Sequence, residues 1–321
     1  MNVLANDGIS QPGVDKLTAA GFNTILESVE QEKIIDFINE NSIEVLLVRS
    51  ATKVRKDLID NCKSIKIIGR GGVGMDNIDV SYAKEKGIYV INTPAASSIS
   101  VAELVFAHLF SCVRSMHISN REMPLDGDKE FKKLKKKYSG GSELKGKTLG
   151  IVGFGRIGQE VAKIGIGIGM NVIFYDLNNK KVEIEIDFFD RSSKKFELES
   201  TTLNELLKES NFISLHVPAQ KDYIIGDKEF SLMKQGSGII NAARGGVIDE
   251  ESLIKYIENK NLSFAALDTF ENEPTPSIKV LMNQKISMTP HIGAATKEAQ
   301  KRIGIELADQ IINIYNSKNV R

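Results

Sequence analysis

The stretch Thr148–Ala162, TLGIVGFGRIGQEVA, decides the fold of this chain. It opens with an apolar run typical of a buried strand, and Gly153, Gly155 and Gly158 follow as G-x-G-x-x-G at the start of a helical pattern. Asp176 ends the next apolar run, NVIFYD, about 20 residues after the last of these glycines. A strand, a glycine-rich turn, a helix and a second strand that ends in an acidic residue together predict a βαβ unit that binds a dinucleotide.

The glycine-rich turn predicts where the phosphates of the dinucleotide lie. Gly153 permits a tight turn, Gly155 lets the backbone approach the pyrophosphate, and Gly158 lets the helix pack closely on the strand. The backbone amides of Arg156 and Ile157 are expected to face the phosphates, because they lie at the positive end of the helix.

Asp176 predicts which dinucleotide binds. A carboxylate at this position accepts hydrogen bonds from the adenosine ribose hydroxyls and repels a 2′-phosphate, so we predict NAD as the cofactor rather than NADP. Lys180 and Lys181 nearby weaken this discrimination slightly. The alternative is a tight strand–helix turn in an α/β protein that binds no nucleotide.

Apolar runs and helical patterns alternate on both sides of this unit, once up to Pro94 and again from Thr148. Near-continuous hydrophobicity predicts strands that are buried on both faces of parallel sheets. These strands are expected within residues 43–50, 65–72, 88–94, 148–155, 171–176, 212–218, 237–244, 264–270 and 285–291. The fold class is therefore predicted as α/β, with two doubly wound parallel-sheet domains: a Rossmann-type NAD domain and a flavodoxin-like substrate domain, with a cleft between them.

We expect a discontinuous substrate-binding domain of residues 1–96 and 292–321, and an NAD-binding domain of residues 97–291. The connection 95–147 is predicted to begin with an apolar helix. Residues 295–315 are predicted to form a last helix that returns to the first domain, so that the chain crosses twice between the domains.

Two charged segments are interpreted as surface structure. Residues 183–200 are expected to form an irregular excursion of the second domain. Residues 132–138, KKLKKKY, are expected to form a solvated loop.

The composition argues against several classes of function. The 321 residues carry 42 Lys and Arg against 42 Asp and Glu, so no net field favours a nucleic acid or a membrane as partner. Cys62 and Cys112 form neither a disulfide framework nor a metal-ligand spacing, and no metal is predicted. The N-terminus lacks a secretory pattern and no apolar stretch has the length of a membrane span, so we expect a cytoplasmic protein.

Candidate catalytic groups follow the predicted strands. His291 lies in TPHIGAAT directly after a strand, where an exposed imidazole can act as a general base. Asp268 and Glu273 lie in LDTFENEP after another strand. In GIINAARGGVID, the apolar residues predict a buried strand, and Arg244 lies at its end. The histidines of the connecting helix are interpreted as packing or surface residues; these are His108 and His117.

Motifs spread over the chain carry a resemblance to a known family. They are VRSATKV (48–54), GRGGVGMDNID (69–79), NTPAASSISVAEL (92–104), LKGKTLGIVGFGRIGQEVA (144–162), NAARGGVIDEESL (241–253), ALDTFENEP (266–274) and TPHIGAATKEAQ (289–300). In this order they resemble the D-2-hydroxyacid dehydrogenase family, and within it the branch of 3-phosphoglycerate dehydrogenases. The resemblance covers essentially the whole chain.

The resemblance implies a role for each catalytic candidate. Arg244 would hold the substrate carboxylate and 2-oxygen, since a guanidinium matches a carboxylate bidentately. Gly245 and Gly246 would leave room for the cofactor and substrate. His291 would remove the hydroxyl proton while hydride leaves C2 for the nicotinamide, and Glu273 would pair with His291 and orient it.

The resemblance also implies cofactor and substrate contacts. Besides the glycine-rich turn and Asp176, the residues expected to contact NAD are His216, Pro218, Ala242, Ala243, Arg244, Asp268, His291, Gly293 and Ala294. Arg49 and Arg70, at strand ends of the first domain, would bind a phosphate dianion of the substrate, with the alternative that one of them only forms a surface salt bridge. Further expected substrate contacts are Ser50, Gly71, Gly72, Val73, Arg244, His291 and, from a neighbouring subunit, Lys136.

The implied activity is the NAD-dependent oxidation of (2R)-3-phosphoglycerate to 3-phosphooxypyruvate, the first step of phosphorylated serine biosynthesis, in a homodimer or homotetramer. One alternative is a glyoxylate or hydroxypyruvate reductase or another D-2-hydroxyacid dehydrogenase. A second alternative is an NADH-sensing binding protein of the corepressor type. The chain ends soon after the last predicted helix, so we expect no serine feedback through an additional C-terminal domain.

Overall fold

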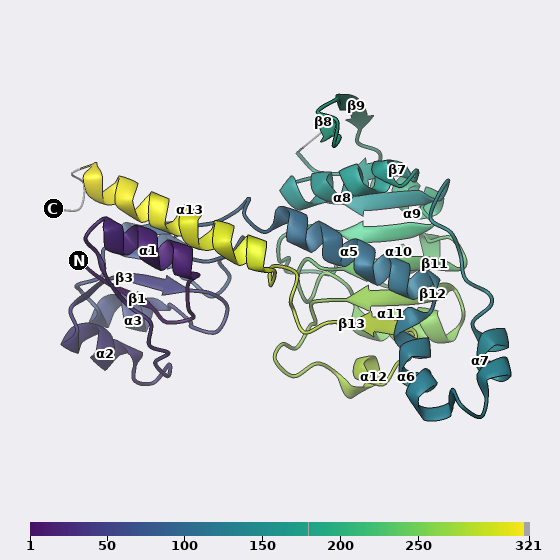
Figure 1. The fold of residues 1–321 in the computed structure, drawn as a ribbon, viewed down its shortest axis with the longest axis horizontal. Helices are drawn as coiled ribbons and strands as arrows, with labels where there is room; N and C mark the ends of the chain where they lie inside the picture. Colours follow the sequence, from purple (N-terminus) through teal and green to yellow (C-terminus); the bar gives the residue numbers. More distant parts are fainter. Residues whose placement is uncertain (179, 318–321) are drawn as a thin grey trace. The chain divides into compact units, whose positions relative to one another are not determined.

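The computed structural model describes residues 1–178 and 180–317 and divides the chain into two compact units. Unit 1 comprises Met1–Ser100 and the described residues from Ala294 onward, and unit 2 comprises Val101–Gly293. Each unit is a parallel sheet with helices on both of its faces (Figure 1). The predicted α/β fold class with two parallel-sheet domains is confirmed. The sequence places the two boundaries slightly earlier, after residues 96 and 291.

Unit 1 is built on a five-stranded parallel sheet in the order β2-β1-β3-β4-β5, the flavodoxin-like arrangement. Its strands are β1 (Asn2–Ala5), β2 (Asn23–Ile25), β3 (Ile43–Val48), β4 (Ile67–Arg70) and β5 (Tyr89–Asn92). The sequence does not predict β1 and β2, because they contain only four and three residues and β2 buries none of its side chains completely.

Two helical layers cover the sheet of unit 1. One layer consists of α1 (Gln11–Ala19) and the C-terminal helix α13 (Lys297–Asn316), which lie side by side. The other consists of α2 (Ile34–Glu40), α3 (Lys56–Asn61) and α4 (Val80–Glu85). Because both faces are covered, the central strand β3 is apolar at nearly every position.

Unit 2 is built on a six-stranded parallel sheet in the order β13-β12-β11-β10-β6-β7. Its strands are β6 (Thr148–Val152), β7 (Asn171–Tyr175), β10 (Phe212–Leu215), β11 (Ser237–Asn241), β12 (Leu262–Leu267) and β13 (Ile286–Met288). The chain leaves β6 toward β7 and later returns to place β10 on the other side of β6. The strand order therefore reverses between β6 and β10, and ligands of such sheets bind at the carboxyl ends of the strands beside this reversal.

Helices on both faces of this sheet complete the core of unit 2. The helices α5 (Ser98–Val113) and α8 (Arg156–Gly167) pack on one face. The helices α9 (Leu203–Glu209), α10 (Asp227–Leu232), α11 (Glu250–Glu258) and α12 (Ile278–Leu281) pack on the other.

The carboxyl ends of the six strands of unit 2 are in register. One row of paired residues crosses the sheet at this edge: Tyr175, Val152, Leu215, Asn241, Leu267 and Met288. Each of these is the last residue of its strand, so the segment that follows every strand begins at the same edge. This register brings the glycine-rich turn together with the segments that carry Asp176, Arg244, Glu273 and His291.

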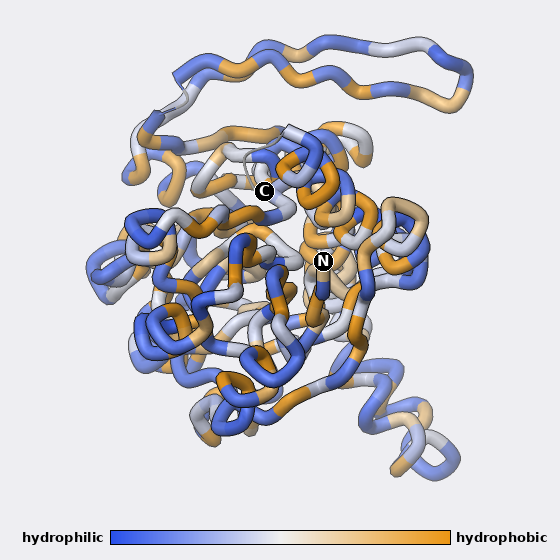
Figure 2. Tube along the Cα trace, turned by 90° about the vertical axis from the view of Figure 1, so that its left-hand side faces the viewer, coloured by the Kyte–Doolittle hydropathy of each residue, from blue (hydrophilic) through white to orange (hydrophobic). Residues whose placement is uncertain are grey.

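The charged segment 183–200 is not irregular, contrary to expectation. It contributes to the antiparallel hairpin of β8 (Lys181–Asp187) and β9 (Ser193–Glu199), which pair along their whole length. The hairpin is at the top of Figure 2, where hydrophilic and hydrophobic residues alternate along it. One face is therefore polar, while Ile184 on the other face joins the core beside α8. The high charge density hides the strand pattern, because only every second residue has to be apolar.

The segment 95–147, which the sequence predicts as a connection, contains three helices and belongs to unit 2 from Val101 onward. After α5 come α6 (Met116–Asp126) and α7 (Phe131–Lys137), so the lysine-rich segment expected as a loop is mostly helical. Leu134 is buried on one side of α7 and the lysines occupy the exposed side. Among the described residues, no single helix has the length and apolar composition of a membrane span; only α5 and α6 taken together, bent by 57°, meet that criterion.

Candidate active site

The glycine-rich turn leads from β6 into α8 at the reversal of the strand order. Gly153 has φ of +91°, a left-handed conformation that favours glycine. A side chain at Gly158 would collide with the carbonyl oxygen of Gly153, so this glycine allows the helix to pack on the turn. At Gly155, by contrast, a Cβ atom would meet no protein atom within 4 Å.

The open space at Gly155 fits a bound dinucleotide. Gly155 is also the N-cap of α8, and no side chain caps the helix at this residue. The first amides of α8, on Arg156 and Ile157, thus begin a twelve-residue helix whose positive end faces this space. Packing within the chain does not require a glycine at position 155, whereas close approach of a pyrophosphate does.

Asp176 directly follows β7 and forms a hydrogen bond with the glycine-rich turn. Its Oδ2 accepts the Phe154 N–H at 2.7 Å, and its Oδ1 accepts the Asn178 N–H at 2.8 Å. The carboxylate thereby stands at the edge of the nucleotide site, where the ribose contact is predicted.

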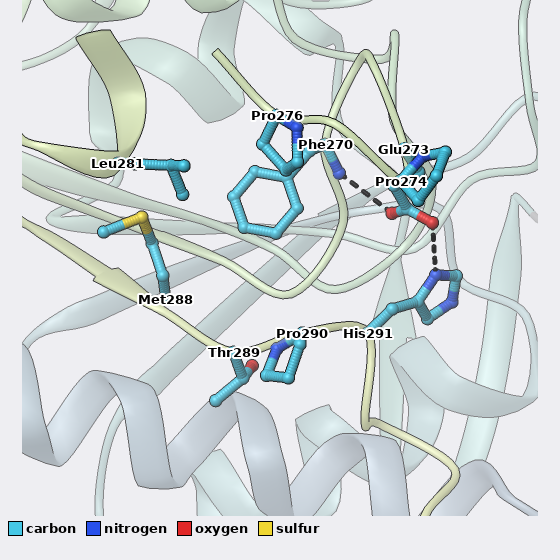
Figure 3. A pocket seen from close by; sticks show the side chains of 9 residues that line it. All are labelled: Phe270, Glu273, Pro274, Pro276, Leu281, Met288, Thr289, Pro290 and His291. Carbon is cyan, nitrogen blue, oxygen red and sulfur yellow. Dashed lines mark hydrogen bonds and ion pairs between the residues drawn. The ribbon is translucent and has the colours of Figure 1, made fainter. Parts of the chain in front are cut away.

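His291 and Glu273 face each other at the ends of β13 and β12. Nδ1 of His291 lies 2.9 Å from Oε2 of Glu273, and Oε1 of Glu273 accepts the Phe270 N–H at 3.1 Å (Figure 3). The imidazole is 41% exposed and the carboxylate 38% exposed, so both groups can reach a ligand. Because Nδ1 donates to the carboxylate, Nε2 of the neutral ring is left as the proton acceptor.

A cavity of about 400 Å³ opens beside this pair. Figure 3 shows the carboxylate of Glu273 and the ring of His291 at one side, with Leu281 and Met288 away from them and Phe270 between. Apart from this pair and Thr289, the residues that line the cavity are apolar.

Asp268 is buried and fixes the loop that carries His291. It is 1% exposed; its Oδ1 accepts the Thr289 hydroxyl at 2.6 Å and the Ile292 N–H at 2.8 Å, and its Oδ2 accepts the Gly293 N–H at 2.9 Å. The contact of Asp268 with the nicotinamide end of NAD stays a prediction. What the structure establishes is that this carboxylate binds three groups on either side of His291.

Arg244 follows β11 at the same edge. Its Nη1 donates to the carbonyl oxygen of Ala243 at 2.6 Å, and its own carbonyl oxygen accepts from Nδ2 of Asn241 at 2.8 Å. The next residue corrects one expectation. A side chain at Gly245 would overlap the carbonyl oxygen of Phe270, so this glycine lets two loops pack together rather than leaving room for a ligand.

The remaining residues expected at the cofactor lie along this edge with different exposure. His216 follows β10, and its Nε2 lies 2.8 Å from the Ser214 hydroxyl, while burial lowers the pKa of the ring to about 3. Pro218 is exposed. Ala242 and Ala243 are 8% and 7% exposed.

Arg49 and Arg70 lie at one edge of the unit-1 sheet. Arg70 is the last residue of β4 and pairs in register with Val48, the last residue of the neighbouring strand β3, which Arg49 directly follows. Both arginines are half-buried. The Arg70 guanidinium lies against Gly72, where a side chain would overlap its Nη1 atom.

The other expected substrate contacts are less enclosed, and two supporting residues escape the sequence analysis. Ser50 and Val73 are exposed, while Gly71 and Gly72 are buried. Asp7, two residues after the end of β1, accepts the Arg49 N–H at 2.6 Å, and Asn77 donates to the Arg49 carbonyl oxygen at 2.8 Å. Asp7 has the same signal as the predicted site residues, a polar side chain close after a strand, but β1 is too short to be predicted.

Lys136 lies on the exposed side of α7 in unit 2, and its contact with a neighbouring subunit stays a prediction. Ala294, the first residue of the returning segment, accepts a hydrogen bond from Nε2 of Gln300 at 2.7 Å. Within the part of the chain that the structure describes, no group of three or more His, Cys, Asp or Glu residues is arranged to hold a metal ion.

The fold and this site define a dinucleotide-binding α/β protein with an imidazole–carboxylate pair at the ligand edge. Residues 106–293 match the family described as "D-isomer specific 2-hydroxyacid dehydrogenase, NAD binding domain". The chain belongs to the D-isomer specific 2-hydroxyacid dehydrogenase family, and NAD is its cofactor.

Named relatives cover both units. A hydroxypyruvate reductase of Thermotoga maritima is 46% identical over 290 residues, which are 89% of this chain and 88% of that protein. A D-3-phosphoglycerate dehydrogenase of Methanocaldococcus jannaschii is 40% identical over 320 residues, covering 99% of this chain and 58% of that protein. This chain thus spans little more than half the length of that relative.

A solved structure of similar fold contains the cofactor. The NAD⁺-bound 3-phosphoglycerate dehydrogenase of Entamoeba histolytica has a TM-score of 0.76 and 28% identity, with coverage of 100% of this chain and 97% of that one.

Proposed function

We propose that the protein catalyses the NAD-dependent oxidation of (2R)-3-phosphoglycerate to 3-phosphooxypyruvate, the first step of phosphorylated serine biosynthesis. The observation that carries the choice of substrate is the position of Arg49 and Arg70 at the ends of adjacent strands. Two guanidinium groups at one sheet edge suit a phosphate dianion, because each can form two parallel charge-assisted hydrogen bonds. The 40% identity to a D-3-phosphoglycerate dehydrogenase supports this choice.

The His291–Glu273 pair provides the general base. In the oxidation direction Nε2 of His291 takes the proton of the C2 hydroxyl, and the positive charge that forms on the ring is stabilised by Glu273 at Nδ1, 2.9 Å away. In reduction the same Nε2 returns the proton to the 2-oxygen. NAD, when bound, would accept the hydride that leaves C2 of the substrate.

Arg244 provides the substrate clamp. Its guanidinium binds the carboxylate and the 2-oxygen, which orients C2 and stabilises negative charge on the oxygen. The Arg244→Ala variant should lose more than about 100-fold in kcat/KM while the NADH Kd changes little, because the clamp contacts the substrate rather than the adenosine half. An active Arg244→Ala variant would remove this residue from the site.

The phosphate role is tested by substrate discrimination. The ratio of kcat/KM for 3-phosphoglycerate to that for D-glycerate should fall at least about tenfold in Arg49→Met and in Arg70→Met, since each loses a charged contact to the phosphate. Arg55→Met is the matched control, because Arg55 lies in the same unit but pairs with Asp79 at 2.9 Å. A wild-type ratio near one, or a ratio unchanged in both variants, would contradict the phosphate site.

A second candidate function is the reduction of hydroxypyruvate. The relative that favours it is the Thermotoga maritima hydroxypyruvate reductase, which is 46% identical over 88% of its length. The catalytic pair and Arg244 would act in the same way, and Arg49 or Arg70 would bind an uncharged hydroxymethyl group or the domain surface. Higher kcat/KM for hydroxypyruvate than for 3-phosphooxypyruvate would establish this alternative.

We propose that the protein is a cytoplasmic homodimer or homotetramer. Support for assembly comes from large apolar side chains exposed along α5, α6 and α7: Phe110, Met116, Met123, Leu125 and Phe131, which are 43–72% exposed. Sedimentation of the purified protein tests this. A monomer at micromolar concentration would contradict it, and a Leu125→Glu variant should shift the equilibrium toward monomer.

A further inference from the structure

His108, which comes from the core helix α5, makes hydrogen bonds at the strand that carries the catalytic loop. Nδ1 of its ring lies 2.9 Å from the Ser287 hydroxyl, within β13, and Nε2 lies 3.0 Å from the Thr289 hydroxyl, directly after β13. The ring is 4% exposed. A buried imidazole that bonds two side chains of one segment is more than an apolar filler of the core.

The direction of these hydrogen bonds follows from the donors and acceptors. The Thr289 hydroxyl donates to the Asp268 carboxylate at 2.6 Å, since a carboxylate can only accept. The oxygen of Thr289 must then accept from His108, so Nε2 carries a proton. Burial lowers the pKa of His108, which keeps the ring neutral and leaves Nδ1 to accept from Ser287.

The chain of bonds ends on both sides of His291. The Asp268 carboxylate that accepts from Thr289 also accepts the N–H groups of Ile292 and Gly293 at 2.8 and 2.9 Å. His291 itself has φ of +53°, a conformation that few non-glycine residues adopt and that persists only where neighbours hold it. The loop therefore needs a rigid anchor, and His108 supplies one from the helix behind the sheet.

We propose that His108 is a positioning residue: through Thr289 and Asp268 it holds the loop of His291 in the geometry that places Nε2 for proton transfer. This inference rests on the proposed base role of His291. It assigns to His108 no contact with substrate or cofactor.

Steady-state kinetics and NADH titration of His108 variants test the proposal. His108→Leu should lower kcat about tenfold with less than a twofold change in NADH Kd, because the loop loosens while the nucleotide turn is untouched. His108→Gln should restore most of the rate, since its amide can donate from nearly the same place to Thr289. The Thr289→Val change should lower kcat by a similar factor and add little to His108→Leu, because the two groups act in one chain.

His117→Leu is the matched control. His117 lies on α6, and its Nε2 donates to the Gln284 carbonyl oxygen at 3.1 Å, two residues before β13. Its Nδ1 lies 3.5 Å from the Ser111 hydroxyl, and it makes no bond to the catalytic loop among the described residues. It should keep the wild-type kcat. Equal losses in His117→Leu and His108→Leu, or full activity of His108→Leu, would overturn the proposal.

A spectroscopic measurement separates positioning from general loss of stability. Nitrogen-15 spectra of the histidine rings should show His108 protonated at Nε2 and unprotonated at Nδ1 near neutral pH. The opposite tautomer would contradict the proposed chain of hydrogen bonds from His108 through Thr289 to Asp268. His291→Gln distinguishes the positioning role of His108 from the base role of His291. If His291→Gln is inactive and His108→Leu has normal activity, only the positioning role of His108 is contradicted. If His291→Gln is fully active, the proposed base role of His291 is contradicted.

Discussion

Nδ1 of His291 lies 2.9 Å from Oε2 of Glu273, although the two residues follow different strands of the unit-2 sheet. Glu273 is fixed at its other oxygen by the Phe270 N–H. His291 is fixed on both sides by the bonds that Asp268 accepts from Thr289, Ile292 and Gly293. The pair therefore selects one tautomer of the imidazole and one direction for Nε2.

The Glu273→Gln variant should lower kcat about 10–100-fold, because a neutral amide can donate as well as accept and no longer stabilises the imidazolium. NADH affinity should stay near normal. Steady-state kinetics and fluorescence titration measure both. Glu271→Gln is the control, since Glu271 accepts the Glu250 N–H at 3.0 Å and has no bond to His291 among the described residues. If both variants lose the same activity, the pair has no special role.

Gly155 and Gly158, at the start of α8, should respond differently when a side chain is introduced. Gly155→Val should leave the melting temperature nearly unchanged and weaken NADH about tenfold or more, because the new side chain enters open space where the phosphates bind. Gly158→Ala should lower stability by about 1–3 kcal/mol, because its Cβ meets the Gly153 carbonyl. Thermal unfolding with and without NADH distinguishes them. Normal NADH affinity of Gly155→Val would contradict the phosphate site.

Asp176→Asn should reduce the preference for NAD over NADP about tenfold, because it removes the charge that repels a 2′-phosphate. The amide oxygen can still accept the Phe154 N–H, so the turn should keep its shape. The comparison of kcat/KM for the two cofactors measures this. An unchanged preference would show that Asp176 only supports the turn.

Stability should fall as the solution becomes acidic, and His216 should contribute to the loss. Burial lowers the pKa of His216 to about 3 in the folded protein, whereas an unfolded histidine titrates near 6.5. The unfolded state therefore binds the extra proton first, and the free energy of unfolding decreases as the pH falls from about 6.5 toward 3, by at most about 1.4 kcal/mol per pH unit for this group.

The His216→Gln variant should show a shallower decrease over the same pH range. Denaturant unfolding at several pH values measures the slope. Equal slopes for wild type and variant between pH 6.5 and 4.5 would show that the ring is not kept neutral by burial.

Much of the candidate site could be predicted from the sequence because strand ends carry recognisable residues. The turn at Gly153, the acid at Asp176 and the pair Glu273–His291 each follow an apolar run, and parallel strands in register bring such ends together. The register itself, with the last residues of six strands in one row, needs the structure.

Some features could not be predicted from the sequence, mainly because they depend on contacts with residues distant along the chain. The sequence of α5 alone does not reveal a role for His108, because its hydrogen-bond partners Ser287 and Thr289 lie far along the chain. The sequence predicts that Gly245 leaves room for a ligand, whereas close packing against the carbonyl oxygen of Phe270 explains this glycine. The sequence does not predict the strands β8 and β9 of the charged hairpin, because only alternate residues in them are apolar.

The most direct test of the account is the rate of NADH formation from NAD and 3-phosphoglycerate by the wild-type protein and by His291→Gln, with NADH binding measured on both. We predict rapid NADH formation by the wild type, a loss of at least about 100-fold in the variant, and similar NADH affinity in the two. A wild-type protein that binds NADH and oxidises no D-2-hydroxy acid, or a His291→Gln variant of equal rate, would contradict the catalytic role of this edge.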